Sequence, residues 1–199
     1  MTIKPYSIIE FDQGSQAWLE WRNQGIGASD APVVMGENPW KKIGKLLQEK
    51  CNPPVDGFKS QAMIRGIRLE PEARVAYNKQ TGYEVNPLCI QSNDHKWMRA
   101  SLDGISTDGS KVVEIKCGES VYKKTATSQK VPRYYYGQLQ HILAVTGLSA
   151  IDFWCYLPGK PNVMVQVPRD KNYIEELTSK ESEFWELVQQ NRKSKGYSG

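Results

Sequence analysis

Hydrophobic positions recur with helical spacing near both ends of the chain and with strand-like spacing in its middle. The helical period predicts helices over 15–23, 41–50, 60–80, 131–145 and 174–190. Runs rich in β-branched and apolar residues predict strands over 83–90, 99–105, 111–117, 150–157 and 163–167, the last two joined by a turn at 158–161. Helices placed before and around a small sheet predict an α/β or α+β fold, in which a central mixed β-sheet is flanked by helices.

Polar residues at the ends of these segments support the boundaries. Ser15 suits the N-cap of the first helix. In the glycine-rich stretch 25–32, either Ser29 or Asp30 suits the cap of a further short helix, which would have Pro32 in its first turn. The closing helix is amphipathic, with one side made by Ile174, Leu177, Glu181, Phe184 and Val188.

The chain has 199 residues, little more than one typical domain of about 150 residues, so 1–199 is expected to form a single domain. A helical N-terminal part would cover about 1–80 and a sheet-containing catalytic core about 81–199, with a frayed polar tail at 191–199. Hydrophobic residues make up 39% and charged residues 24%, which excludes disordered and fibrous proteins. Because no stretch approaches about 20 apolar residues and no apolar signal core is present, we expect a soluble, cytoplasmic protein with no membrane contact.

Charge and cysteine usage narrow the chemistry only slightly. The formal net charge of +4 permits a polyanionic partner without demanding one. The cysteines are isolated from one another and only two histidines are present, which argues against a Cys/His zinc site. We expect the four thiols to be small buried groups: Cys51, Cys89, Cys117 and Cys155.

The most informative segment reads as a β-hairpin around Asp108–Gly109. This dipeptide between β-like runs is typical of a two-residue type I′ turn. Such a loop places Asp103 opposite Glu114, with Cβ atoms about 4.5–5.5 Å apart. It also places Ser101 opposite Lys116. Because side chains alternate along a strand, these four polar groups would share one face, and the other face would be a core-facing apolar set of Leu102, Val113, Ile115 and Cys117.

Two carboxylates held together repel each other, and a divalent cation between them would reverse the sign of that interaction. Oxygen ligands from Asp103 and Glu114 suit Mg²⁺ or Mn²⁺ rather than zinc or copper. A metal that lowers the pKa of a water, with Lys116 beside it, fits phosphodiester hydrolysis. The alternative is a surface hairpin whose Glu–Lys pair is solvated and contributes about 0–1 kcal/mol. An odd-length loop would also move one carboxylate to the other face.

The spacing Asp103, Glu114, Lys116 resembles the PD-(D/E)XK nuclease superfamily, although no proline precedes Asp103. A wider set of motifs occurs in order at 18–22 (WLEWR), 25–30 (GIGASD), 66–71 (GIRLEP), 100–104 (ASLDG), 114–116 (EIK) and 135–140 (YYGQLQ). As a set, these motifs resemble the YqaJ-type viral recombinase family, which includes phage lambda exonuclease. The resemblance implies a restriction-endonuclease-like core.

The resemblance also implies an activity and partners. Members of that family are Mg²⁺-dependent exonucleases that degrade one strand of duplex DNA from its 5′ end. They form ring-shaped trimers and act beside a phage single-strand annealing protein, so a phage or prophage origin is expected. Two alternatives stay open: a structure-specific or nicking endonuclease of the same superfamily, and a catalytically silent DNA-end-binding adaptor for recombination.

The resemblance assigns the metal ligands to Asp103, Glu114 and the main-chain carbonyl of Ile115. Lys116 would help to orient or activate water. Glu70 would face the metal through a water, although an exposed helical Glu near arginines is usually a minor salt bridge. The intact set of catalytic residues argues against the silent adaptor.

The resemblance assigns capture of the 5′-phosphate to Arg22, Ser29, Ser101 and Gln138, with Tyr135 beside them. From the residues alone, Ser29 is more often an N-cap and Arg22 a solvated helix residue. Tyr134 and Tyr136 compete with Tyr135 for the same alignment. We interpret His141 as structural, and the Trp18–Trp21 pair as core rather than a stacking platform. A basic cluster after the hairpin suits either phosphates or plain solvation: Lys123, Lys124, Lys130 and Arg133.

Overall fold

The computed structural model describes residues 4–54 and 60–194. Its centre is one mixed sheet in the order β1-β3-β4-β5-β6-β7, with β2 pairing alongside β4. The strands are β1 (Tyr6–Ile9), β2 (Ile26–Gly27), β3 (Val85–Ser92), β4 (Met98–Ser106), β5 (Val112–Lys116), β6 (Ala150–Cys155) and β7 (Val163–Pro168). The β5–β6 and β2–β4 pairs are parallel and the others antiparallel, so the predicted mixed sheet is confirmed.

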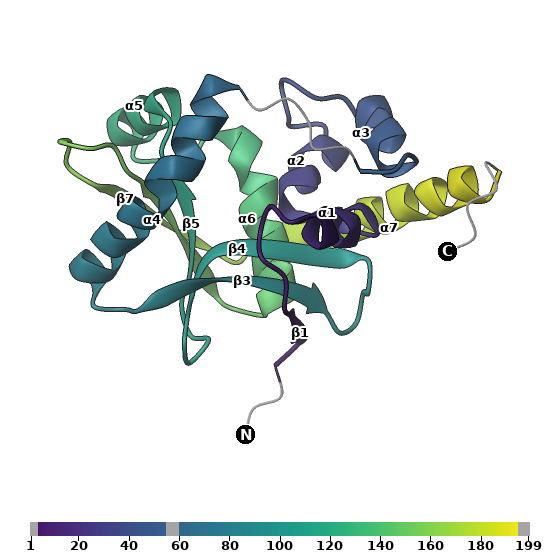
Figure 1. Ribbon diagram of the computed structural model, residues 1–199, viewed down its shortest axis with the longest axis horizontal. Coiled ribbons are helices and arrows are strands. Elements are labelled where there is room, and N and C mark those ends of the chain that lie inside the picture. The colour runs from purple at the N-terminus through teal and green to yellow at the C-terminus, as the bar shows by residue number, and fades with distance from the viewer. Residues whose placement is uncertain (1–3, 55–59, 195–199) are drawn as a thin grey trace.

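Helices cover both faces of this sheet. They are α1 (Gln16–Asn23), α2 (Ala31–Val34), α3 (Ile43–Lys50), α4 (Gln61–Thr81), α5 (Glu119–Ser128), α6 (Arg133–Thr146) and α7 (Lys171–Ser194), with a 3₁₀ turn at Ala28–Asp30. In Figure 1, α4 crosses in front of the sheet and α6 lies behind it. One core cluster joins α6 to β4, β5 and β6, and another joins α4 to β5 and β6. The flanked sheet agrees with the expectation from the sequence.

Local chemistry fixes the helix ends close to the predicted positions. The Oγ atoms of Ser15 and Ser60 accept hydrogen bonds from the backbone N–H groups three residues on, which caps α1 and α4. Helices α4 and α6 end at Gly82 and Gly147, whose φ angles of 78° and 73° lie in the left-handed region that favours glycine.

Three elements were not predicted. Helix α5 has threonines and a valine in a short polar segment, and β1 and β2 are strands of four and two residues. Their existence depends on partners, because β1 pairs with β3 and β2 pairs with β4. Two strands from the first 80 residues therefore belong to the central sheet. Helix α7 continues to Ser194, so the prediction that the chain frays from residue 191 is wrong for 191–194. Residues 195–199 lie outside the described residues.

The turn of the central hairpin differs from the prediction, but the register does not. Residues 107–110 form a four-residue loop, in which the N–H of Gly109 donates to the carbonyl of Ser106 at 2.8 Å and Gly109 has φ 75°. The prediction of a two-residue type I′ turn is wrong, because that turn needs a positive φ angle at both central residues and Asp108 does not have one. The loop is longer by one residue on each side, so Gly104 still pairs with Val113 as predicted. Asp103 lies close to Glu114, because its side chain accepts a hydrogen bond from the next residue of β5, Ile115.

A β-bulge reshapes the hairpin next to the acidic residues. The β3–β4 register shifts between Asn86 and Leu88, where one extra residue enters β4 near Asp103–Gly104. A Cβ atom on Gly104 would lie 2.6 Å from Val85 Cγ2, so this position requires glycine. The bulge changes the alternation of side chains. Leu102 therefore packs in the α6 cluster, and its predicted place with Val113, Ile115 and Cys117 is wrong, because those three pack in the α4 cluster.

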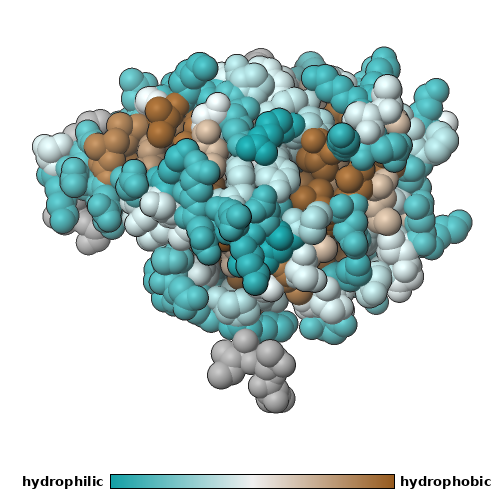
Figure 2. Space-filling view, turned by 180° about the vertical axis from the view of Figure 1, so that it is seen from behind, coloured by the Kyte–Doolittle hydropathy of each residue, from teal (hydrophilic) through white to brown (hydrophobic). Residues whose placement is uncertain are grey.

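The interior agrees with the other expectations. All four cysteines are free and buried, and the predicted side of the closing helix is buried along its length. None of the described helices combines the length and apolar character needed to cross a membrane. Seen from behind, the surface is mainly hydrophilic with two separate hydrophobic areas (Figure 2). Polar residues thus divide the apolar surface on this face.

Candidate functional site

The two predicted acidic side chains lie together where β4 and β5 separate. The Oδ2 atom of Asp103 accepts a hydrogen bond from the backbone N–H of Ile115 at 2.7 Å. Glu114 is only 2% exposed, and its Oε1 accepts from Lys116 Nζ at 2.5 Å and from Gln138 Nε2 at 2.6 Å. A side chain, rather than continued backbone pairing, therefore connects the two strands at this point.

The second oxygen of Glu114 has no partner. Its Oε2 is one of four buried side-chain polar atoms in the described residues that form no hydrogen bond. Leaving a charged acceptor buried and unsatisfied is costly, and such an atom in a native protein is often satisfied by a bound ion or water. The orphaned oxygen lies on the acidic residue that the sequence singled out.

The electrostatics of the site are those of like charges forced together. Burial and the neighbouring Glu114 carboxylate raise the pKa of Asp103 well above its usual range. Burial alone would lower the pKa of Lys116, but Glu114 and Asp103 raise it above its ordinary value. Lys116 is thus held in its charged form. Its single positive charge does not offset the repulsion between the carboxylates of Asp103 and Glu114, since the pKa of Asp103 is still raised.

Glu70 reaches the same site from α4. It forms an ion pair with Arg74 one turn further along the helix, and Arg74 Nε also donates to the carbonyl of Asp103 at 2.7 Å. Burial raises the pKa of Glu70, and the Glu114 carboxylate adds to that rise. The predicted salt bridge with an arginine and the predicted proximity to the acidic pair are therefore both present.

These residues fit a hard divalent cation. The donor set is oxygen only, and one oxygen of the buried Glu114 carboxylate has no hydrogen-bond partner. Within the described part of the chain, no three Asp, Glu, His or Cys side chains gather closely enough to hold an ion by themselves. Such a site suits Mg²⁺, which is usually bound by one or two carboxylates and keeps several waters.

A second group of predicted residues gathers around Trp18. Arg22 Nη2 donates to Ser29 Oγ at 2.8 Å, and its guanidinium lies 4.6 Å from the centre of the Trp18 ring. The indole Nε1 of Trp18 donates to Ser101 Oγ at 2.8 Å. Arg22, Ser29 and Ser101 thus come from three separate segments to one place, and Ser101 is two residues from Asp103 along β4. Their donors suit a phosphate.

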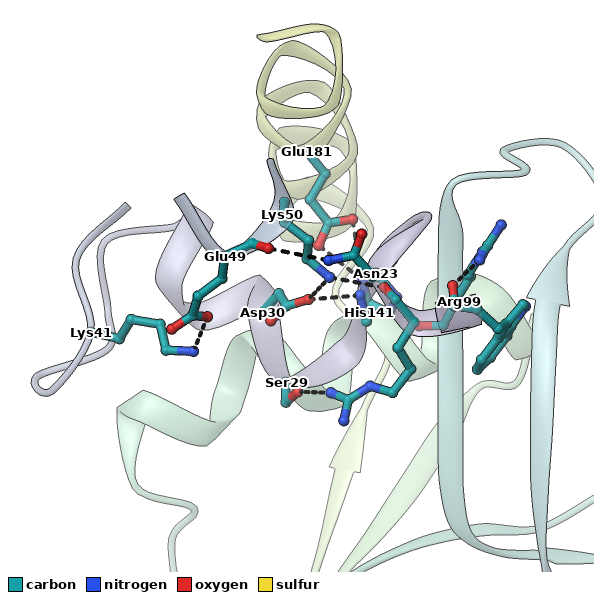
Figure 3. A network of polar contacts seen from close by, with 12 residues as sticks. Asn23, Ser29, Asp30, Lys41, Glu49, Lys50, Arg99, His141 and Glu181 are labelled. Carbon is teal, nitrogen blue, oxygen red and sulfur yellow. Dashed lines mark hydrogen bonds and ion pairs between the residues drawn. The ribbon is translucent and has the colours of Figure 1, made fainter. Parts of the chain in front are cut away.

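A buried polar network adjoins this cluster, with Asp30 and Lys50 drawn above Ser29 in Figure 3. Asp30 forms a 2.8 Å ion pair with Lys50, and both side chains are nearly inaccessible to solvent. Lys50 Nζ also donates to the carbonyl of Arg22, and Asp30 accepts from the N–H of Gly27. Burial raises the pKa of Asp30, but Lys50 and Arg22 outweigh it and hold that pKa below its usual value. The network fixes α1 and α3 relative to the turn that carries Ser29.

The three consecutive tyrosines, Tyr134, Tyr135 and Tyr136, have different surroundings. The Tyr135 ring centre lies 4.8 Å from Lys116 Nζ, so Tyr135 faces the acidic site. Tyr134 packs against Trp40, and Tyr136 packs against Tyr173 of α7. Gln138 contacts Glu114, which places it with the acidic residues rather than in direct contact with Arg22 or Ser29.

Two sequence interpretations can now be compared with the contacts. His141 is fully buried, with Nδ1 2.8 Å from Glu181 and Nε2 3.0 Å from the carbonyl of Arg99, so its structural role is confirmed. Trp21 is buried as expected. The assignment of Trp18 to the core is wrong, because it is only partly buried and bridges Arg22 to Ser101.

Sequence reasoning missed Trp18, the Asp30–Lys50 pair and Arg74 as supporting residues. The Trp18–Arg22 spacing of one helical turn was a usable signal for the first. Nothing local could pair Asp30 with Lys50, because they lie on separate elements.

The comparisons with known proteins agree with this geometry. The model of the YqaJ-like viral recombinase domain matches residues 17–149. The chain is similar to the uncharacterised protein YqaJ of Bacillus subtilis, at 27% identity over 93% of this chain and 60% of that protein. It is also similar to the uncharacterised protein R354 of Acanthamoeba polyphaga mimivirus, at 29% identity over 73% of this chain and 29% of that protein. The chain therefore spans less than two thirds of the length of these relatives.

Solved structures extend the likeness. The structure of LHK-Exo in complex with dAMP has a TM-score of 0.81 and 25% identity, and covers 90% of this chain and 95% of that one. LHK-Exo is described as an alkaline exonuclease from Laribacter hongkongensis. A phage-related exonuclease from Haemophilus somnus 129PT shares the fold alone, with a TM-score of 0.60 and 11% identity over 83% of this chain and 96% of that one. The chain belongs to the YqaJ-like viral recombinase family.

Proposed function

We propose that this protein is a Mg²⁺-dependent 5′→3′ exonuclease that degrades one strand of linear double-stranded DNA from a 5′-phosphorylated end. The observation that carries the proposal is the buried Glu114 carboxylate, which contacts Lys116 and Gln138 through one oxygen and has no partner at the other. Asp103 lies beside it on the neighbouring strand. The likeness to LHK-Exo, an alkaline exonuclease solved with a deoxynucleotide, supports a DNA substrate.

The acidic residues supply the ligands for the cation. Asp103, Glu114 and the main-chain carbonyl of Ile115 would hold Mg²⁺, with Mn²⁺ as a substitute, and Glu70 would contact it through a water. When bound, the ion would lower the pKa of a water and offset the charge of the scissile phosphate. Lys116 would orient the attacking water and stabilise charge that develops on the phosphate.

The cluster around Trp18 supplies the direction of degradation. Arg22, Ser29 and Ser101 would bind the terminal 5′-phosphate through charge-assisted hydrogen bonds. Gln138 and Tyr135, which lie one helical turn apart on α6, would contact the end nucleotide on the side of the acidic pair. Anchoring one end beside the reacting phosphate gives a polarity to hydrolysis.

The same proposal includes an assembly and a biological setting, which rest on the family. The active form would be a ring-shaped homotrimer that encloses duplex DNA. It would act in the cytoplasm of a bacterial host, beside a phage single-strand annealing protein during recombination. Light scattering of the purified protein at several concentrations would give the number of subunits, and a monomer at all concentrations would contradict the ring.

The test is digestion of three substrates with and without Mg²⁺. A linear duplex labelled at its 5′ ends, the same duplex labelled at its 3′ ends, and a closed circular duplex are each incubated with the protein. We expect early release of the 5′ label, late release of the 3′ label, and no cleavage of the circle. Chelation with EDTA should stop the reaction.

Glu114→Gln is the decisive variant, and Glu119→Gln is its matched control on an exposed helix start. The first should abolish hydrolysis and the second should leave it unchanged. Cleavage of the circle would instead indicate an endonuclease. Binding to DNA ends without hydrolysis in Mg²⁺ would indicate a silent adaptor. Full activity of Glu114→Gln would refute the catalytic assignment.

A further inference from the structure

A tryptophan stands in solvent near the start of α6. The side chain of Trp40 is 73% exposed, the highest value among the large hydrophobic residues of the described chain. It lies in the loop that joins α2 to α3. This loop is braced, because the N–H groups of Trp40 and Lys41 both donate to Asn38 Oδ1 at 2.8 Å. Glu37 in the same loop forms a 2.6 Å ion pair with Arg133 of α6.

A continuous row of aromatic rings leads from Trp40 to the acidic site. The Trp40 and Tyr134 ring centres lie 4.8 Å apart at 75°, and the Tyr134 and Tyr135 centres lie 4.7 Å apart. Lys116 Nζ lies 4.8 Å from the Tyr135 ring centre. Neighbouring rings of the row are therefore in contact, and the outermost side chain, Trp40, is largely exposed.

Positive charge lies along the same edge. Lys124 Nζ of α5 is 5.3 Å from the Tyr134 ring centre. Beside it, α5 and the residues that directly precede α6 line an open hollow of about 560 Å³. Lys123, Lys124 and Lys130 line this hollow, and no carboxylate of the described residues does. Figure 1 shows α5 on one side of the start of α6 and the α2–α3 loop on the other.

Aromatic faces beside a cationic groove have a known use in binding single-stranded nucleic acid. Every base has a π-face that can stack, and the lysines follow the phosphates. Base-paired duplex hides those faces, so the row would select unpaired nucleotides. We propose that Trp40 and Tyr134 form a stacking platform for unpaired bases of DNA, and that the lysine hollow binds phosphates of the same strand. This inference rests on the proposed function for the identity of the ligand as DNA.

The test measures binding in EDTA, so that hydrolysis plays no part. The probes are a fluorescent oligothymidylate and an abasic oligonucleotide of equal length, followed by fluorescence anisotropy. We expect the wild type to bind the oligothymidylate more tightly. Trp40→Ala should weaken that binding about tenfold, which corresponds to about 1.4 kcal/mol, without changing binding of the abasic probe. Trp40→Phe should keep most of the affinity.

Tyr83→Ala is the matched control, because Tyr83 is also exposed and also has a lysine, Lys111, near its ring. It should bind like the wild type. Replacement of Lys123, Lys124 and Lys130 by Gln should weaken both probes and reduce the dependence on salt. The proposal is overturned if the wild type binds both probes equally. It is also overturned if Trp40→Ala binds oligothymidylate like the wild type. If that variant binds normally but forms assemblies of a different mass, Trp40 contributes to subunit contacts and the platform is rejected.

The outcome is separable from that of the nuclease test. Normal hydrolysis of linear duplex with unchanged binding by Trp40→Ala would reject the platform and keep the exonuclease. Base-dependent binding that needs Trp40, in a protein that hydrolyses no DNA with Mg²⁺, would keep the platform and reject the exonuclease.

Discussion

The carboxamide of Gln138 donates a 2.6 Å hydrogen bond to Oε1 of Glu114, which joins the middle of α6 to β5. The same oxygen accepts from Lys116. Two donors therefore fix one oxygen of the carboxylate, while the other, Oε2, is buried without a hydrogen-bond partner. Gln138 is in this contact a positioning residue for the proposed metal ligand, in addition to any contact with the DNA end.

Gln138→Leu should weaken metal binding. Outer partners of metal ligands typically change affinity by about 10–100-fold, because they orient the ligand. We expect the Mg²⁺ concentration needed for half-maximal thermal stabilisation to rise by roughly tenfold or more. An unchanged metal dependence, together with a lost preference for 5′-phosphorylated ends, would restrict Gln138 to the phosphate.

Addition of Mg²⁺ or Ca²⁺ should raise the melting temperature of the protein. A ligand that binds only the folded state stabilises it by about 2.7 kcal/mol at 100 times its dissociation constant. Glu114→Gln should reduce the rise, and Glu119→Gln should preserve it. Differential scanning calorimetry at several metal concentrations measures the effect. If saturating metal leaves the melting temperature of the wild type unchanged, the proposed metal site at the acidic residues is contradicted.

Arg22→Ala should impair the use of 5′-phosphorylated ends. A hydrogen bond to a charged group contributes about 1.5–3 kcal/mol, so we expect roughly a 10–100-fold loss of kcat/KM on these ends and little loss on 5′-hydroxyl ends. Trp18→Phe keeps an aromatic ring for Arg22 but removes the indole N–H bonded to Ser101, so its loss should be smaller. Equal losses on both kinds of end would show that the phosphate anchor lies elsewhere.

Asp30→Asn should destabilise the fold strongly. The substitution leaves the buried Lys50 ammonium without its 2.8 Å partner, and breaking such a pair costs about 3–5 kcal/mol. Urea unfolding of the purified variant measures this loss. Further replacement of Lys50 by Met should recover much of it, because the unpaired charge is then removed. A double variant as unstable as Asp30→Asn alone would contradict this account.

The buried His141–Glu181 pair should make stability depend on pH. Burial lowers the pKa of His141, but the Glu181 carboxylate outweighs it and raises that pKa above 6.5. A raised folded-state pKa gives stability that is fully present below 6.5 and is lost as the pH rises through the folded value. The free energy of unfolding of the wild type should therefore decrease as the pH rises from 6 through the raised pKa of His141. His141→Gln should flatten that dependence, as urea titrations at fixed salt would show, and an equal slope in both proteins would contradict it.

The helices with clear caps were predictable because their signals are local. Ser15, Ser60, Gly82 and Gly147 lie at the ends of α1, α4 and α6, and each acts within one turn. The hairpin register was also predictable, because the loop grew symmetrically about Asp108–Gly109. Helix α5 and strands β1 and β2 were not, since their own residues carry weak preferences and their partners lie elsewhere in the chain.

The sequence by itself determined that Asp103, Glu114 and Lys116 lie together on one hairpin, within a set of ordered motifs. The alternation of side chains along a strand and the composition of a turn depend on a few consecutive residues, so they can be read from the sequence without knowledge of tertiary contacts. Only the tertiary structure decided that Gln138 meets Glu114, that Trp18 joins Arg22 to Ser101, and that Trp40 stands beside Tyr134. These contacts connect elements far apart in sequence, and their geometry comes from the bulge and from the packing of α1 and α6 against the sheet.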